Sequence, residues 1–108
     1  MPIEFYHVTY EKNEESIMKN GLVPQTGERT TIANHPVGVY LFKDIDSIHR
    51  AFEDWLPDYL DIENENIIIL KVSLPDEFVQ KYIVDHCEDE VYSTETIPPE
   101  YLECVVWM

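Results

Sequence analysis

The chain has 108 residues, of which 44% are hydrophobic, so it can form one domain with a sizeable core. Its 7 basic and 22 acidic side chains give a formal net charge of -15, and such a surface repels phosphate backbones and disfavours nucleic-acid binding. Seven Tyr, four Phe and two Trp are spread along the chain, which excludes a disordered acidic tail.

The acidic surface suits a basic protein partner or mimicry of nucleic acid, and it also serves simply to keep a small protein soluble and monomeric. The N-terminus lacks the basic and apolar regions of a signal peptide, and no apolar run approaches the ~20 residues that a membrane span needs. Cys87 and Cys104 do not have the CxxC spacing of zinc sites, so the set His86, Cys87 and Cys104 is only a weak candidate for zinc binding. We therefore expect a cytoplasmic protein with reduced thiols and no membrane contact.

The first stretch, from Ile3 to Thr9, alternates in the manner of a strand that opens on aromatic residues. Residues two apart in a strand face the same side. His7 and Thr9 are therefore expected to point together into one cleft, with Val8 on the opposite face.

A short helix is predicted next. Asn13 is the expected N-cap, and Glu14 and Glu15 suit a first turn, where the helix dipole favours acids. Gly21 suits a helix end, a place that often needs positive φ, and Pro24 prevents the helix from resuming.

The polar segment from Gln25 to Pro36 is long enough to be a functional loop. Its Arg29 could grip a phosphate or carboxylate with two hydrogen bonds, which makes it a candidate cofactor-binding residue. The alternative is that Arg29 is solvated or pairs with a nearby acid.

A strand over 37–42 and a helix over 45–56, capped by Asp44 or Asp46, are predicted after this loop. The helix has an apolar stripe at the i, i+3, i+4, i+7 spacing of a buried face. The stripe consists of Ile48, Ala51, Phe52 and Trp55.

Residues 67–72 form the most apolar run and are predicted to be a central strand. One helical turn is expected over 76–81, with short strands over 82–84, 91–94 and 101–107. The whole chain, 1–108, therefore predicts a single α+β domain with a mostly antiparallel sheet and two main helices in its N-terminal half.

The order of several short motifs resembles the ADP-ribosyltransferase fold, which includes the poly(ADP-ribose) polymerases and the RNA 2′-phosphotransferases. The motifs are Phe5-Tyr6-His7-Val8-Thr9, a short helix ending at Gly21-Leu22, then Gly38-Val39-Tyr40-Leu41-Phe42 and a helix. The run from Thr94 to Leu102, with its Ile-Pro-Pro-Glu, is similar to a late segment of the 2′-phosphotransferases. The resemblance implies two small sheets with NAD bound in a cleft between them.

The resemblance also implies roles for individual residues. His7 would hydrogen-bond an NAD ribose hydroxyl, Thr9 would support the same pocket and Tyr40 would stack on the nicotinamide ring. Glu90 would be the catalytic carboxylate that orients the 2′-hydroxyl and stabilises the developing sugar cation, with Glu88 and Glu95 as competitors. The alternative for His7 and Tyr40 is a structural role in a strand and in the core.

Two departures from the family pattern stand out: Val8 replaces the usual glycine after the histidine, and the chain is short for the family. The leading hypothesis is a protein that binds NAD and transfers ADP-ribose to a protein or small nucleophile. The rival is a non-catalytic acidic protein that binds a basic partner. A third hypothesis, an RNA 2′-phosphotransferase, conflicts with the scarcity of basic residues.

Overall fold

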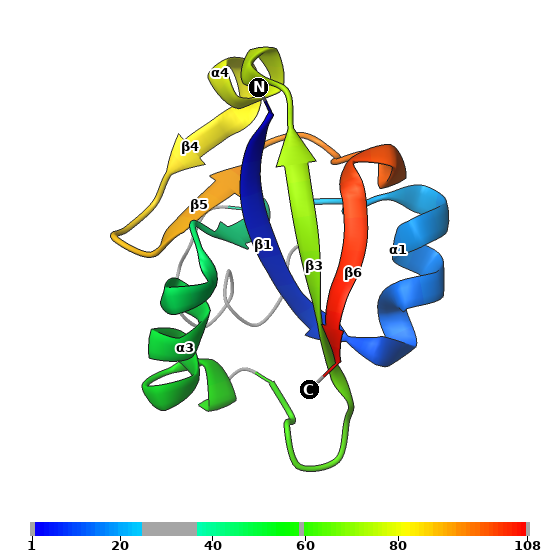
Figure 1. Cartoon of the computed structure of the whole chain (residues 1–108), viewed down its shortest axis with the longest axis vertical. Coiled ribbons are helices and arrows are strands. Elements are labelled where there is room, and N and C mark those ends of the chain that lie inside the picture. Colours follow the sequence, from blue (N-terminus) through cyan, green and yellow to red (C-terminus); the bar gives the residue numbers. More distant parts are fainter. Residues whose placement is uncertain (1, 25–36, 59, 108) are drawn as a thin grey trace.

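The structure is a computed structural model, and it describes residues 2–24, 37–58 and 60–107. Figure 1 shows a curved sheet with helices on both faces. The strands are β1 (Ile3–Tyr10), β2 (Val39–Phe42), β3 (Ile67–Leu74), β4 (Ile83–Asp85), β5 (Glu90–Ser93) and β6 (Leu102–Trp107). The α-helices are α1 (Glu14–Asn20), α3 (Ile45–Glu53) and α4 (Asp76–Tyr82), and the 3-10 helices are η1 (Glu11–Asn13), η2 (Leu56–Asp58) and η3 (Pro99–Tyr101).

The described strands form one six-stranded sheet in the order β4-β5-β2-β1-β3-β6, and neighbouring strands are antiparallel. The expectation of two small sheets is therefore wrong. β1 pairs with β3 along its whole length, from Ile3↔Leu74 to Tyr10↔Ile67, but its register with β2 consists of the pair Tyr6↔Phe42. The two halves of the sheet, β4-β5-β2 and β1-β3-β6, remain continuous through that narrow connection.

The first core lies on the face of the sheet that carries Phe5 of β1 and Leu70 of β3. Leu41 of β2 and Leu70 are fully buried in it. Side chains of α1, α4 and η3 cover this core, among them Ile17, Phe78, Val79 and Tyr101. These contacts place the short helix α1 against the same face of the sheet as Phe5.

The second core lies on the other face, under α3. Ile48 and Ala51 of α3 are buried against Phe42 and Ile69, as the predicted apolar stripe requires. The rings of Phe42 and Trp55 stack with their centroids 6.1 Å apart. β3 lies between β1 and β6, and Ile67, Ile68, Ile69 and Leu70 are all buried, so the prediction of a buried strand inside the sheet is confirmed.

Of the two helix N-caps predicted from the sequence, the structure shows a capping hydrogen bond at α3 but not at α1. The Asp44 carboxylate accepts a hydrogen bond of 2.7 Å from the Ser47 amide, so Asp44, rather than Asp46, caps α3. Asn13 precedes α1 as predicted, but its side chain makes no capping bond, because η1 already gives it helical backbone angles. Its amide instead donates to the Thr9 hydroxyl at 3.4 Å.

Candidate functional site

The end of α1 is fixed by a contact with the segment that follows β5. Gly21 has φ 84° and ψ -177°, a region open almost only to glycine. Leu22 and Ile97 exchange two main-chain hydrogen bonds of 2.9 Å. A Cβ added to Gly21 would collide with the carbonyl oxygen of Ile97 and lie 3.3 Å from the Cα of Pro98. The Gly-Leu and Ile-Pro-Pro stretches of the resemblance are thus adjacent in space.

A groove of about 500 Å³ runs between β1 and α1. We call it the β1–α1 groove. His7 and Thr9 line one side of it, so the prediction that these two side chains share a cleft is confirmed. The described lining consists of His7, Thr9, Asn13, Ser16, Ile17, Asn20, Gly21, Leu22 and Val23.

No carboxylate belongs to the described lining of this groove, although the chain has 22 acidic residues. Two other grooves differ: the lining of one includes Glu11, Glu14, Glu15 and Glu65, and the lining of another includes Asp58, Asp61 and Glu63. The β1–α1 groove instead offers an imidazole, hydroxyls and amides, which both donate and accept hydrogen bonds. Such a lining fits a neutral or anionic ligand that is rich in hydroxyl groups.

The His7 ring spans the place where β1 and β2 separate. Its Nδ1 lies 2.9 Å from the carbonyl oxygen of Tyr40. A carbonyl only accepts, so Nδ1 carries the proton, and in the neutral ring Nε2 is the acceptor nitrogen. The main chain of β2 therefore selects the tautomer of His7 and fixes the ring orientation.

The Tyr40 side chain lies on a different face from His7. Along β2, Leu41 belongs to the first core and Phe42 to the second, so alternation directs the Tyr40 ring to the second face. There it contacts the His86 ring at 5.1 Å and the Tyr92 ring at 5.5 Å between centroids. Tyr40 is connected to the β1–α1 groove through its main-chain carbonyl, which accepts the hydrogen bond from His7.

Glu90 begins β5 and is paired in register with Phe42 of β2. Its side chain is 2% exposed, whereas Glu88 and Glu95 are exposed. Among the described carboxylates it is the one classed as buried. Register and alternation place Glu90 and Tyr40 on the same face of the β2–β5 pair, so the structure brings these two predicted residues together, apart from the His7 side chain.

Val8 does not enter the groove. It packs against the second core, on the face opposite to His7. The departure from the family's glycine therefore leaves the groove open. Arg29, the predicted anion-binding residue, lies outside the described residues.

Three groove residues were missed in the sequence: Asn13, Ser16 and Asn20. Their spacing of i, i+3, i+7 puts them on one side of α1, next to Ile17. A polar stripe on the side of a helix that faces a strand is the signal that could have revealed them, but it required knowing which strand the helix covers.

Ion pairs gather at the turn between β4 and β5. Arg50 of α3 donates from Nε to Asp89 at 3.1 Å, and Lys43 bonds Asp85 at 2.9 Å. The Arg50 hydrogen bond holds the pKa of Asp89 below its usual value, with smaller help from Ser47. The hydrogen bonds from Ser47 likewise lower the pKa of Asp44.

Metal and membrane features are absent from the described part of the chain. No three His, Cys, Asp or Glu side chains of the described residues are grouped to hold a metal ion, and Cys87 and Cys104 form no disulfide bond with each other. No helix within the described ranges has the length and apolar character needed to cross a membrane.

Comparison with known proteins assigns no family. No family model matches the chain, and no curated protein and no solved structure matches it.

Proposed function

We propose that this chain binds NAD in the β1–α1 groove and transfers ADP-ribose to an acceptor nucleophile. The observation that supports this most is the lining of the groove: none of the described residues that line it is a carboxylate, in a chain of net charge -15, and one of them is a histidine whose Nδ1 donates to the Tyr40 carbonyl. A dinucleotide carries two anionic phosphates and two ribose diols. The absence of carboxylates from the described lining spares the phosphates from repulsion, and Nε2 of His7 can accept a hydrogen bond from a ribose hydroxyl.

The reaction proceeds at the nicotinamide ribose. The C1′–N bond breaks, its electron pair leaves with neutral nicotinamide, and the acceptor forms a new bond to C1′ and loses its proton. The charge that develops is a sugar cation, which a carboxylate near the 2′-hydroxyl stabilises. Glu90 is assigned this role because burial of a carboxylate is costly and is characteristic of functional groups.

The proposed pose of NAD uses both halves of the sheet. One ribose would occupy the β1–α1 groove at His7 and Thr9. The nicotinamide ribose would pass through the separation between β1 and β2 to reach Tyr40 and Glu90, whose side chains lie in the other half of the sheet and on its opposite face. In this pose the ligand passes next to the hydrogen bond between His7 Nδ1 and the Tyr40 carbonyl.

Calorimetric titration with NAD tests the binding step. Wild-type protein is expected to bind, and His7→Ala is expected to lose binding while keeping its thermal unfolding transition. Met18→Ala is the matched control, because Met18 is an exposed residue of α1 outside the groove lining. Absence of binding by the folded wild-type protein at about millimolar NAD would refute the proposal; a Kd of about 1 mM corresponds to a binding free energy of about -4 kcal/mol.

Release of nicotinamide tests the chemical step. Wild-type protein is expected to release it, and Glu90→Gln is expected to bind NAD without releasing it. An RNA 2′-phosphotransferase would instead remove the phosphate from a 2′-phosphorylated oligonucleotide in the presence of NAD, so the same protein samples decide between these two reactions.

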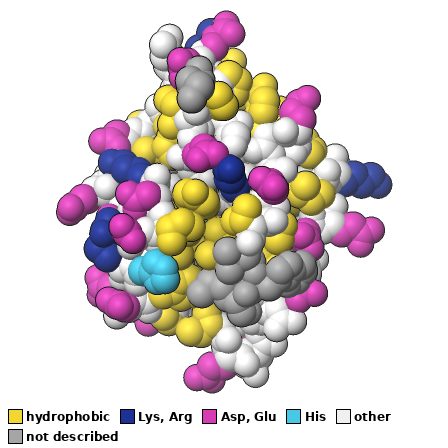
Figure 2. Space-filling model, viewed as in Figure 1, with side chains coloured by type: hydrophobic (Ala, Val, Ile, Leu, Met, Phe, Trp, Pro, Cys, Tyr) yellow, Lys and Arg dark blue, Asp and Glu magenta, His cyan; other side chains and the backbone are white. Residues whose placement is uncertain are grey.

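Two observations favour the non-catalytic rival. The Tyr40 ring is packed against His86 and Tyr92 and leaves the sheet on a different face from His7. Figure 2 shows acidic side chains spread around a central hydrophobic area on one face of the molecule, as expected for a surface that attracts a basic partner. Salt-sensitive capture of a basic protein that is unaffected by His7→Ala, without NAD binding, would establish the rival.

A further inference from the structure

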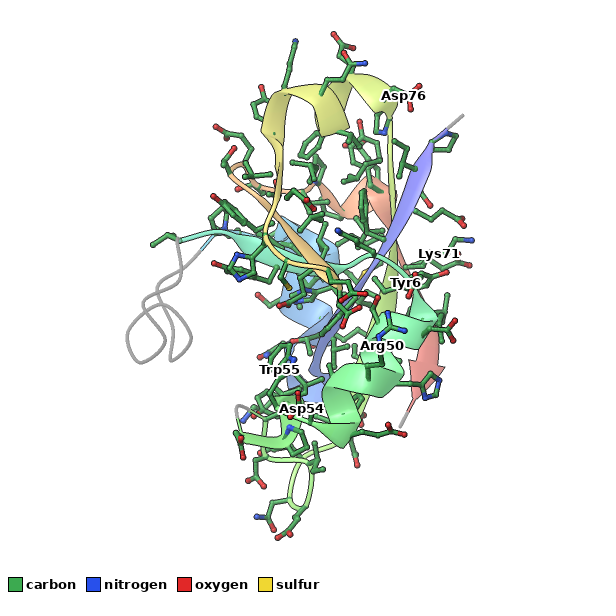
Figure 3. The ribbon with its side chains drawn as sticks, turned by 90° about the vertical axis from the view of Figure 1, so that its left-hand side faces the viewer. Tyr6, Arg50, Asp54, Trp55, Lys71 and Asp76 are labelled. Carbon is green, nitrogen blue, oxygen red and sulfur yellow. The ribbon has the colours of Figure 1, made fainter. Side chains whose placement is uncertain are left out.

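The turn that leads into β5 is attached to α3 through a network of side chains. Arg50 donates to the Asp89 carboxylate from Nε at 3.1 Å and also from Nη2. Ser47 donates to the same carboxylate oxygen at 3.3 Å. Ser47 is itself held by Asp44, through bonds of 2.7 Å to its amide and 2.8 Å to its hydroxyl. Figure 3 shows Arg50 on α3.

The main chain of the same turn is fixed as well. The Lys43 amide donates to the Asp89 carbonyl at 2.9 Å, and the Glu90 carbonyl accepts from the His86 and Cys87 amides at 3.1 Å each. Asp89 is thus held by both its carbonyl and its carboxylate, immediately before Glu90. Because Asp89 directly precedes Glu90 in the chain, the orientation of Asp89 sets the direction in which the Glu90 side chain leaves β5.

Basic residues are scarce in this chain, which has seven in all, yet two of them, Lys43 and Arg50, bind carboxylates that flank this one turn. Exposed ion pairs contribute little to global stability. Arg50 is half-exposed, so its bond to Asp89 is better explained by local positioning than by stabilisation of the fold.

We propose that Arg50, acting through Asp89, is a positioning residue for the Glu90 carboxylate. This inference rests on the proposed function for its catalytic consequence. Removal of the two hydrogen bonds that Arg50 donates to Oδ1 of Asp89 lets the start of β5 shift, and a displacement of about 1 Å at a reacting group can lower a rate about 100-fold. Binding of NAD in the β1–α1 groove does not involve Arg50 and stays unchanged.

The test compares Arg50→Gln with His49→Gln, a neighbouring exposed position on α3. Arg50→Gln is expected to lower kcat for nicotinamide release by about 10- to 100-fold without a change in KM, and His49→Gln is expected to leave both constants unchanged. Asp89→Asn should lower kcat similarly, and the double variant should be no slower than either single variant, since both remove one link. A rise in KM alone, or fully additive losses, would overturn the assignment.

A readout without turnover separates this inference from the proposed function. The carboxyl carbon resonance of Glu90, assigned by its loss in Glu90→Gln, is expected to shift in Arg50→Gln and to stay in place in His49→Gln. If the resonance shifts but the wild-type protein never releases nicotinamide, the positioning holds and the proposed function fails. If the resonance does not move in Arg50→Gln, the positioning itself is refuted.

Discussion

Replacement of Gly21 by alanine should destabilise the whole molecule, although the residue lies at the end of a helix of only seven residues. Its backbone angles, φ 84° and ψ -177°, cost a residue with a Cβ about 1–3 kcal/mol. The new Cβ would also push away the carbonyl of Ile97 and weaken the two hydrogen bonds between Leu22 and Ile97, each worth about 0.5–1.5 kcal/mol. Alanine recovers about 0.4–1 kcal/mol by restricting the unfolded chain.

The net loss expected for Gly21→Ala is therefore about 2–4 kcal/mol, which lowers the melting temperature of a domain of this size by roughly 10–25 °C. Urea unfolding followed by circular dichroism measures it, with Lys19→Ala as the control on the same helix, expected to change stability by less than about 0.5 kcal/mol. Hydrogen exchange at the Leu22 and Ile97 amides should accelerate in Gly21→Ala. A loss below about 1 kcal/mol, or unchanged exchange at those two amides, would refute the reasoning.

Three further predictions concern stability. Asp44→Ala removes the carboxylate that accepts the hydrogen bond from the Ser47 amide, and it should lower the free energy of unfolding in urea by about 0.5–2 kcal/mol. Asp46→Ala should lower it by less. Asp44 and Asp89 have lowered pKa values in the folded state, so their contribution is present above their usual pKa of about 3.9 and disappears as the pH falls through the lowered values. Melting temperatures measured from about pH 6 to pH 2 should fall less steeply below about pH 4 in Asp89→Asn than in wild type, and parallel curves would contradict this. Leu70→Ala, at a fully buried site of the central strand, should cost about 2–5 kcal/mol, and a loss under about 1 kcal/mol would show that the site is not part of the core.

Much of the candidate site was accessible from local patterns. The alternation of β1 predicted that His7 and Thr9 share a side, and both line one groove. The glycine before Leu22 predicted the helix end and its positive φ, and Gly21 has φ 84°. The apolar stripe of Ile48 and Ala51 predicted the buried face of α3. Each of these patterns needs only the geometry of a single strand or helix.

The failures share one physical origin, which is pairing between distant segments. The sequence of a strand does not show which strands pair with it. The expectation of two sheets was therefore wrong, because the pair Tyr6↔Phe42 keeps the sheet continuous. The Asn13 cap failed because Asn13 is the last residue of η1 and has helical backbone angles. The Tyr40 ring was assigned to the same cleft as His7, a question that depends on how β2 faces β1.

The sequence by itself determined the order and kind of the main helices and strands, the groove-facing side of β1 and the buried side of α3, because hydrophobic periodicity and turn chemistry act within a few residues. Only the tertiary structure decided that Ile97 meets Leu22, that the Tyr40 carbonyl orients His7, and that Glu90 is buried on the face of the sheet opposite to the β1–α1 groove. Those contacts join residues far apart in the chain, and strand pairing and side-chain packing across the whole molecule select them.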